Sequence, residues 1–133
     1  MPKLPKIAYG MRVLVVDDEL MVQMLLEQFL SSEGHEVVVA SNGKEALARL
    51  EEASYDLIFT DVHMPLMDGV EFVRQVRSRD LHCPIVVMDS YPDLFLESGS
   101  AQEALAVLAK PFDLWEVRQI LHAIEPTQVG LRR

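Results

Sequence analysis

Four charged residues stand directly after short hydrophobic runs of the chain: Asp17, Asp18, Asp61 and Lys110. Short runs rich in Val, Ile and Leu are typical of buried strands in a parallel sheet, and functional side chains gather at the carboxyl ends of such strands. We therefore expect three carboxylates and one ammonium group at one edge of a sheet. Carboxylate oxygens suit Mg²⁺ or Mn²⁺, and an ammonium group neutralises the charge of a phosphoryl group. The pattern predicts a site for a divalent cation and a phosphoryl group.

The elements that must position these residues alternate between short apolar runs and longer segments with helical spacing. The apolar runs predict five strands, at about 11–16, 36–40, 56–60, 84–89 and 105–109. Strands interleaved with helices favour a parallel sheet covered on both faces. We therefore expect an α/β fold, a flavodoxin-like doubly wound three-layer sandwich with five helices and a five-stranded parallel sheet in the order 2-1-3-4-5. In that order the first and third strands are neighbours, so the carboxylates that follow them can converge.

The helices between the strands carry their own start and stop signals. The first is expected to bury a stripe made of Val22, Leu25, Leu26 and Phe29. Residues suited to end or begin a helix are Gly34 after the first, Ser41 or Asn42 before the second, Asp68 before the third and Asp113 before the fifth. The fourth helix, near 91–97, is expected to be short because a Ser-Gly-Ser run follows it.

The length and composition are those of one globular domain. The chain has 133 residues, and we expect residues 10–125 to form the domain, with tails at 1–9 and 126–133. The second tail is expected to begin at Pro126, because proline disrupts a helix. No hydrophobic stretch approaches the roughly 20 residues that span a bilayer, so we expect no membrane insertion and a cytoplasmic location.

Charge and single residue types exclude several other classes of site. The net charge of −9 argues against nucleic acid as a direct partner, because binding to a phosphate backbone relies on clustered Lys and Arg. Cys83 is the only cysteine, so an internal disulfide is impossible. His35, His82 and His122 share no ligand spacing and are interpreted as surface residues. For Trp115, half-covered packing is slightly favoured over contact with a partner.

Three motifs together resemble those of one protein family. They are the pair Asp17-Asp18, the run 61–69 (Asp-Val-His-Met-Pro-Leu-Met-Asp-Gly) and Lys110 with the Pro and Phe that follow it. Each alone is common, but their order and their placement at strand ends are specific. The chain resembles a receiver domain of the two-component response-regulator family, over about residues 11–124.

The resemblance implies a phosphorylation switch. Asp61 would be the nucleophile that takes a phosphoryl group from the phosphohistidine of a histidine kinase or phosphotransfer protein. Asp18 and Asp61 would bind Mg²⁺ or Mn²⁺ directly, Asp17 would bind it mainly through water, and His63 would offer its backbone carbonyl. Lys110 would bind the phosphoryl group. Such a domain is a phosphoacceptor rather than an enzyme.

The resemblance also implies how such a domain signals. The output partner, an unidentified protein, would contact the face made by the segments 91–97, 105–109 and 113–124. The same face would serve a homodimer.

The chain departs from the family pattern at the positions that normally couple phosphorylation to this face. Asp89 stands where the family has the hydroxyl of Thr or Ser, and Val107 stands where the family usually has Tyr or Phe. An ionised carboxylate donates no hydrogen bond, and at about 4 Å it would repel a phosphoryl charge by roughly 4 kcal/mol. Ser90 could supply the hydroxyl only if the strand has already ended or bulges there, because consecutive strand residues face opposite sides.

Two hypotheses follow from Asp89. In the first, phosphoryl chemistry is retained while its coupling to the output face is altered. In the second, Asp89 pairs with Lys110 or binds the metal, and the domain is a degenerate receiver that acts as a protein-interaction module without phosphorylation. A solvent-facing carboxylate without a role is a third interpretation.

Two other classes are weaker alternatives. A small phosphatase with an aspartyl-phosphate intermediate would carry a second acid two residues after the nucleophile, where this chain has His63. A nucleotide or flavin binder would need a Gly-rich or hydroxyl-rich loop after the first strand.

Overall fold

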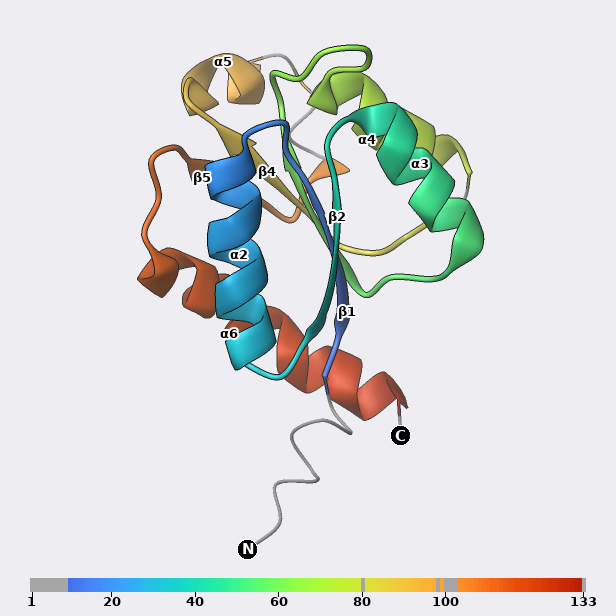
Figure 1. The fold of residues 1–133 in the computed structure, drawn as a ribbon, viewed down its shortest axis with the longest axis vertical. Coiled ribbons are helices and arrows are strands. Elements are labelled where there is room, and N and C mark those ends of the chain that lie inside the picture. The colour runs from blue at the N-terminus through green and yellow to red at the C-terminus, as the bar shows by residue number, and fades with distance from the viewer. Residues whose placement is uncertain (1–9, 80, 98, 100–102, 133) are drawn as a thin grey trace, which may run out of the picture.

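A five-stranded parallel sheet forms the centre of the computed structural model, which describes residues 10–79, 81–97, 99 and 103–132. The strand order is β2-β1-β3-β4-β5, and every neighbouring pair is parallel (Figure 1). The strands are β1 (Arg12–Val16), β2 (Glu36–Ala40), β3 (Leu57–Asp61), β4 (Ile85–Asp89) and β5 (Ala106–Ala109). Each lies within one residue of its predicted position, and the predicted order is confirmed.

Helices cover both faces of the sheet. They are α2 (Leu20–Ser32), α3 (Gly43–Glu52), α4 (Gly69–Ser78), α5 (Pro92–Glu97) and α6 (Leu114–Arg132). In Figure 1, α2 and α6 lie on one side of the sheet and α3 and α4 on the other. The flavodoxin-like sandwich is therefore confirmed, and α5 is short, as its sequence predicts.

Two core clusters fill the layers on either side of the sheet. In β1, Val13 and Val15 point toward α2 and α6, while Leu14 and Val16 join the cluster under α3 and α4. Alternate residues of a strand face opposite sides. Because both sides of this sheet are covered, the strand appears in the sequence as a continuous apolar run.

Side-chain caps fix the helix starts that the sequence predicts. The Asn42 Oδ1 accepts a hydrogen bond from Glu45 N, and the Asp68 Oδ1 accepts one from Glu71 N, each at 2.9 Å. Before α6, Asp113 and Glu116 each accept the backbone N–H of the other, which is a capping box. After α2, Gly34 has a φ of 96°, the left-handed conformation that favours glycine.

Helix α2 is rotated slightly from the predicted orientation. Its buried residues are Leu26 and Leu30, while Leu25 is exposed. Val22 and Phe29 are partly buried and flank this narrower stripe. The prediction for Leu25 was therefore wrong, because apolar spacing does not distinguish the centre of a helix stripe from its edge.

Three other expectations need correction. Helix α6 continues to Arg132, so the helix end expected at Pro126 is wrong; an internal proline removes one hydrogen bond and can be accommodated within a helix. His35 is buried, and its Nδ1 accepts a hydrogen bond from Met11 N at 3.0 Å. The Trp115 side chain is exposed rather than half-covered.

The predicted tail at residues 1–9 lies outside the described residues. Among those described, no helix is both long and apolar enough to cross a membrane.

Candidate functional site

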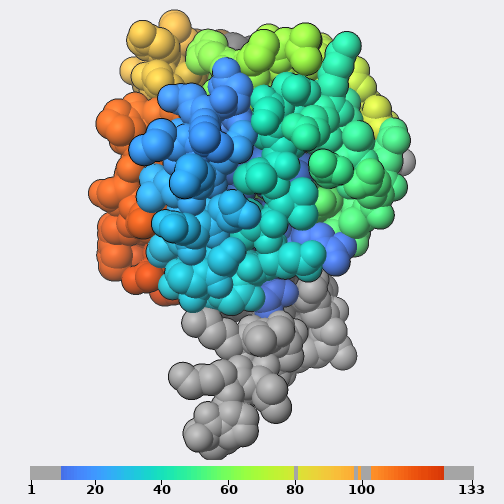
Figure 2. Space-filling model, in the orientation of Figure 1, coloured from blue at the N-terminus to red at the C-terminus, as the bar shows by residue number. Residues whose placement is uncertain are grey.

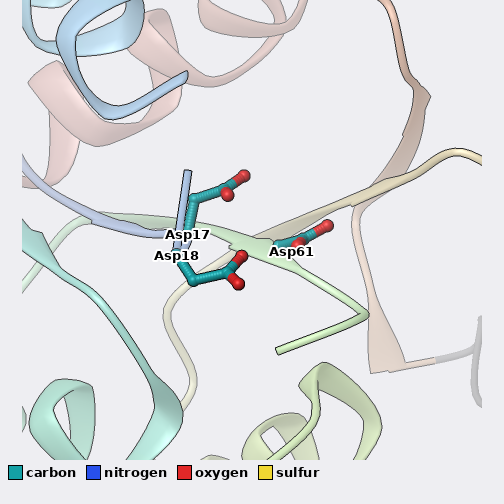
Figure 3. A group of neighbouring side chains, drawn as sticks. All are labelled: Asp17, Asp18 and Asp61. Atoms are coloured by element: carbon teal, nitrogen blue, oxygen red, sulfur yellow. The ribbon is translucent and has the colours of Figure 1, made fainter. Parts of the chain in front are cut away.

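Three carboxylates meet at the carboxyl edge of the sheet, where β1 and β3 end side by side. Val16 pairs with Thr60 across these strands, so Asp17 and Asp18 leave β1 beside Asp61, the last residue of β3. One carboxylate oxygen from each of the three lies within 4.8 Å of those of the other two. Figure 3 shows the three side chains pointing into one region above the strand ends. The predicted convergence of these residues is therefore present.

The three carboxylates differ in their exposure to solvent. Asp17 is fully buried and Asp61 is 5% exposed, whereas Asp18 is exposed. Burial raises the pKa of Asp61 to about 6, with a further contribution from the charge of Asp17 and an opposing one from Lys110. Burial also raises the pKa of Asp17, against the hydrogen bond from Lys110. Two adjacent carboxylates are thus held in a site where negative charge is costly.

Lys110 provides the positive charge of the cluster. Its Nζ lies 2.8 Å from Asp17 Oδ2, 2.9 Å from Glu19 Oε1 and 3.2 Å from Asp61 Oδ1. Burial lowers the pKa of Lys110, but the hydrogen bonds to Asp17 and Glu19 outweigh it and leave the pKa above its ordinary value. The ammonium group therefore stays charged next to the Asp61 oxygen.

Glu19 is a member of this cluster that sequence reasoning missed. In the sequence it is only the acidic residue that directly precedes the first predicted helix. Its carboxylate instead binds Lys110 from the solvent side, while Glu19 N donates to Asp17 Oδ1 at 2.9 Å. The signal in the sequence is the third acid in succession after β1.

A glycine permits the close approach of α4 to the end of β3. A Cβ on Gly69 would lie 2.3 Å from the Asp61 carbonyl oxygen and 2.7 Å from the Val62 Cα. Gly69 N donates to Val62 O at 2.7 Å. The two ends of the run 61–69 therefore contact each other, and this contact fixes the backbone of Asp61.

Asp89 lies at the end of β4, but its partners differ from those proposed from sequence. Its Oδ1 lies 3.2 Å from His63 Nε2 and accepts a hydrogen bond from Tyr91 N at 3.0 Å. Within the described chain, the acids that pair with Lys110 are Asp17, Glu19 and Asp61, and the three-carboxylate group does not include Asp89. At 1% exposure, Asp89 is also not a solvent-facing carboxylate.

The remaining two atypical positions flank the site. β4 ends at Asp89, so Ser90 stands just beyond the strand, where it is exposed. Ser90 lines a surface depression of about 270 Å³ together with Lys110, Leu25 and Phe112. Val107 is partly buried against the core cluster on the α3 and α4 side.

The donor set fits Mg²⁺. Three carboxylates with adjacent oxygens, one of them exposed, are hard ligands that leave room for water in an octahedral shell. A bound cation would also offset the mutual repulsion of the acids. These residues are thus suited to hold the ion, with Asp18 at the open side.

Binding of Mg²⁺ is therefore expected to stabilise the protein against heat, by about 2.7 kcal/mol at a concentration 100 times the dissociation constant. Asp18→Asn should weaken the affinity about tenfold or more, because it removes one charged ligand while leaving the buried pair in place. Calorimetric titration and thermal denaturation with and without Mg²⁺ measure both effects. Glu27→Gln, which removes an exposed acid on α2, is the matched control and should behave as the wild type. Equal affinity in Asp18→Asn would contradict the assignment.

Comparisons with protein families and with individual sequences agree on one family. Residues 13–122 match the family model for the response regulator receiver domain. The chain is 30% identical over 116 residues to sporulation initiation phosphotransferase F of Bacillus subtilis, covering 86% of this chain and 94% of that protein. It is 36% identical over 118 residues to the alkaline phosphatase synthesis transcriptional regulatory protein PhoP of the same organism, covering 85% of this chain but only 48% of PhoP.

Solved structures show the same similarity in three dimensions. The response regulator TrrA from Thermotoga maritima, in complex with Mg²⁺-BeF, superimposes with a TM-score of 0.78 at 31% identity, covering 85% of this chain and 97% of TrrA. The receiver domain of a sensor histidine kinase from Pseudomonas aeruginosa, with a magnesium ion in its active site cleft, gives a TM-score of 0.79 at 27% identity. That match covers 91% of this chain and 98% of the other.

Proposed function

Because this chain belongs to the family of response regulator receiver domains, we propose that it accepts a phosphoryl group on Asp61. The observation that carries the proposal is the setting of Asp61. Asp61 ends β3 and is almost fully buried. One of its carboxylate oxygens lies within 4.8 Å of an oxygen of each of the two other carboxylates. Its Oδ1 lies 3.2 Å from Lys110 Nζ. A carboxylate in this setting can act as a nucleophile, and the neighbouring ammonium group can stabilise the negative charge of the transferred group.

Different residues of the site contribute to different parts of the phosphoryl transfer. An Asp61 oxygen forms a bond to phosphorus while the bond from phosphorus to the donor's histidine nitrogen breaks. Lys110, already in contact with Asp61, offsets charge on a phosphoryl oxygen. Asp18, Asp61 and the His63 carbonyl are proposed to bind Mg²⁺ or Mn²⁺, with Asp17 acting mainly through water. The bound cation would neutralise developing charge on the transferred group.

The alternatives have less support. A degenerate receiver requires a blocked or incomplete site, whereas the three carboxylates lie together in one cluster and Lys110 contacts Asp17 and Asp61. A phosphatase of the aspartyl-phosphate type would need an acid at the position of His63. We therefore place the protein as a phosphoacceptor rather than as an enzyme that turns over a separate substrate.

The partners and location follow from this function. The phosphodonor is a histidine kinase or phosphotransfer protein, and the location is the cytoplasm. The output partner, or a second copy of the chain, would bind the surface of α5, β5 and α6. Large apolar side chains are exposed there, namely Leu94, Leu96, Leu105 and Trp115. The predicted domain at residues 10–125 is part of this proposal, and its last helix, α6, continues beyond that boundary to Arg132.

The surface beside Asp61 offers a docking place for the phosphodonor. The first turns of α2 expose Leu20, Met21, Met24 and Leu25. Val22 and Leu25 also line the depression that reaches Lys110 and Phe112. Figure 2 shows α2, in blue and cyan, presenting a broad outer face beside the orange segment around β5 and the start of α6. Exposed apolar side chains next to a reactive group are typical of a protein interface.

Met21→Asp is therefore expected to slow phosphoryl transfer from a phosphorylated histidine kinase about tenfold or more, because it places a charge at the centre of this apolar surface. Uptake from a small phosphodonor should not change, since the Met21 side chain is 78% exposed on α2 and is not one of the acids or the lysine of the cluster. Leu94→Asp, at another exposed apolar position, on α5, is the matched control and should change neither rate. Equal transfer rates for Met21→Asp and the wild type would overturn this docking surface. If the wild type gained no phosphoryl group from the kinase and none from the small phosphodonor, the proposed function would be overturned.

A further inference from the structure

One buried carboxylate joins the two loops that border Asp61 on its β4 side. Asp89 is the last residue of β4 and is 1% exposed. Its Oδ1 faces His63 Nε2 at 3.2 Å and Tyr91 N at 3.0 Å. His63 belongs to the loop after β3 and Tyr91 to the loop after β4. A single carboxylate oxygen therefore holds both loops.

This contact restricts a side chain that would otherwise be free to move. The His63 side chain is 65% exposed, and it lies only two residues after Asp61. An exposed side chain with no fixed partner exchanges between rotamers. Here the ring is held by Asp89 and meets the edge of Tyr91, with ring centres 6.4 Å apart and planes at 79°. The backbone beneath is fixed as well, because Val62 N donates to Met88 O at 3.1 Å. The imidazole is thus held against Asp89 and Tyr91, on the loop that directly follows Asp61.

Asp89 does not act on Asp61 chiefly as a charge. Burial does most to raise the pKa of Asp61; among the neighbouring charges, that of Asp17 raises this pKa, that of Lys110 lowers it and that of Asp18 raises it. The route from Asp89 to the acceptor therefore runs through His63, whose N–H the carboxylate faces. This differs from the function of a hydroxyl at the same position, which would contact the phosphoryl group itself.

We propose that Asp89 is a positioning residue for the lifetime of phosphorylated Asp61, because it holds the His63 imidazole over the rim of the site and so limits the access of water. The inference rests on the proposed function. In hydrolysis a water oxygen bonds to phosphorus, the bond between phosphorus and the Asp61 oxygen breaks, and the carboxylate is restored. The water protons pass to the released phosphate or to solvent. An ordered ring at the rim excludes water from the line of this attack.

The test compares four proteins: the wild type, Asp89→Asn, His63→Ala and the double variant. Asparagine at 89 keeps an oxygen that can accept from Tyr91 N, but its neutral amide binds the imidazole less strongly than a carboxylate does. Each protein is labelled with a small phosphodonor and Mg²⁺, freed of donor, and followed by intact mass. The initial label reports the proposed function, whereas its decay reports the role of Asp89. Thermal denaturation of the unlabelled proteins reports any purely structural effect.

We expect Asp89→Asn and His63→Ala each to shorten the half-life of the label about threefold or more, and the double variant to decay no faster than His63→Ala, as expected for residues in contact. A wild-type half-life in Asp89→Asn would overturn the proposal, including when its melting temperature has fallen. The proposal would also be overturned if Asp89→Asn accelerated the decay of the label equally in the wild type and in His63→Ala, because Asp89 would then act independently of His63. Absence of initial label in the wild type would overturn the proposed function, and this inference with it.

Discussion

Asp61→Asn is expected to raise the stability of the metal-free protein at neutral pH by about 3 kcal/mol, although it removes the acceptor. The reason is that Asp61 is nearly buried beside Asp17, which raises its pKa from 3.8 to about 6. A shift of about two units corresponds to roughly 3 kcal/mol of unfavourable free energy for the ionised form. Asparagine has the shape of the carboxyl group without its charge.

The pH dependence of this effect has a definite sign. Between pH 3.8 and about 6 the folded wild type holds a proton on Asp61 that the unfolded chain has released. The contribution of Asp61 to the free energy of unfolding therefore falls with rising pH in this window. The difference between Asp61→Asn and the wild type should be near zero at pH 4, grow up to pH 6 and then level off. Urea denaturation in the presence of a chelator, at several pH values, measures it. Asp93→Asn, an exposed acid on α5, is the control without a pH-dependent difference. A stability difference that is constant with pH would contradict the assignment.

Lys110→Met is expected to have the opposite effect on stability, a loss of about 3–5 kcal/mol at neutral pH, because it leaves a buried carboxylate without its counter-charge. Lys110 Nζ contacts Asp17, which is fully buried, as well as Asp61. The pKa of Lys110 is raised in the folded protein, so its contribution is fully present at pH 7 and is lost only as pH rises through that raised value. Phosphoryl uptake should also fall about a hundredfold, as when an electrostatic donor is removed from other active sites.

A second variant separates these two effects of Lys110. Adding Asp17→Asn to Lys110→Met removes the unpaired buried charge, so most of the lost stability should return, while phosphoryl uptake should stay well below that of Asp17→Asn alone. Lys44→Met, at an exposed position in α3, is the matched control for loss of a lysine and should leave both quantities unchanged. If phosphoryl uptake recovered together with stability, Lys110 would be a structural residue only.

Most of the fold could be predicted because it depends on patterns that are local in the sequence. The strands are buried on both faces and therefore appear as continuous apolar runs. Asn42, Asp68, Asp113 and Gly34 mark helix ends by their own hydrogen bonds or conformation. The carboxylate cluster followed from the strand order, since the residues after adjacent parallel strands meet at one edge.

The parts that could not be predicted depend on distances between segments far apart in the chain. The contact of Glu19 with Lys110 and that of His63 with Asp89 require the positions of loop side chains, which spacing does not specify. The exposure of Leu25 depends on the exact rotation of α2 on the sheet. A glycine in the run 61–69 was part of the family motif, but its reason, the approach of Gly69 to the Asp61 carbonyl oxygen, appears only in the structure.

In the proposed function, Asp61 is a phosphoryl acceptor that is supported by a cation and by Lys110. The most direct measurement is the mass of the intact wild-type protein after incubation with a small phosphodonor and Mg²⁺, followed by mapping of the modified peptide. We expect the addition of one phosphoryl group on the peptide that carries Asp61, no addition when a chelator replaces Mg²⁺, and none in Asp61→Asn. An unchanged mass for the wild type with Mg²⁺, or a phosphoryl group that still attaches in Asp61→Asn, would contradict it.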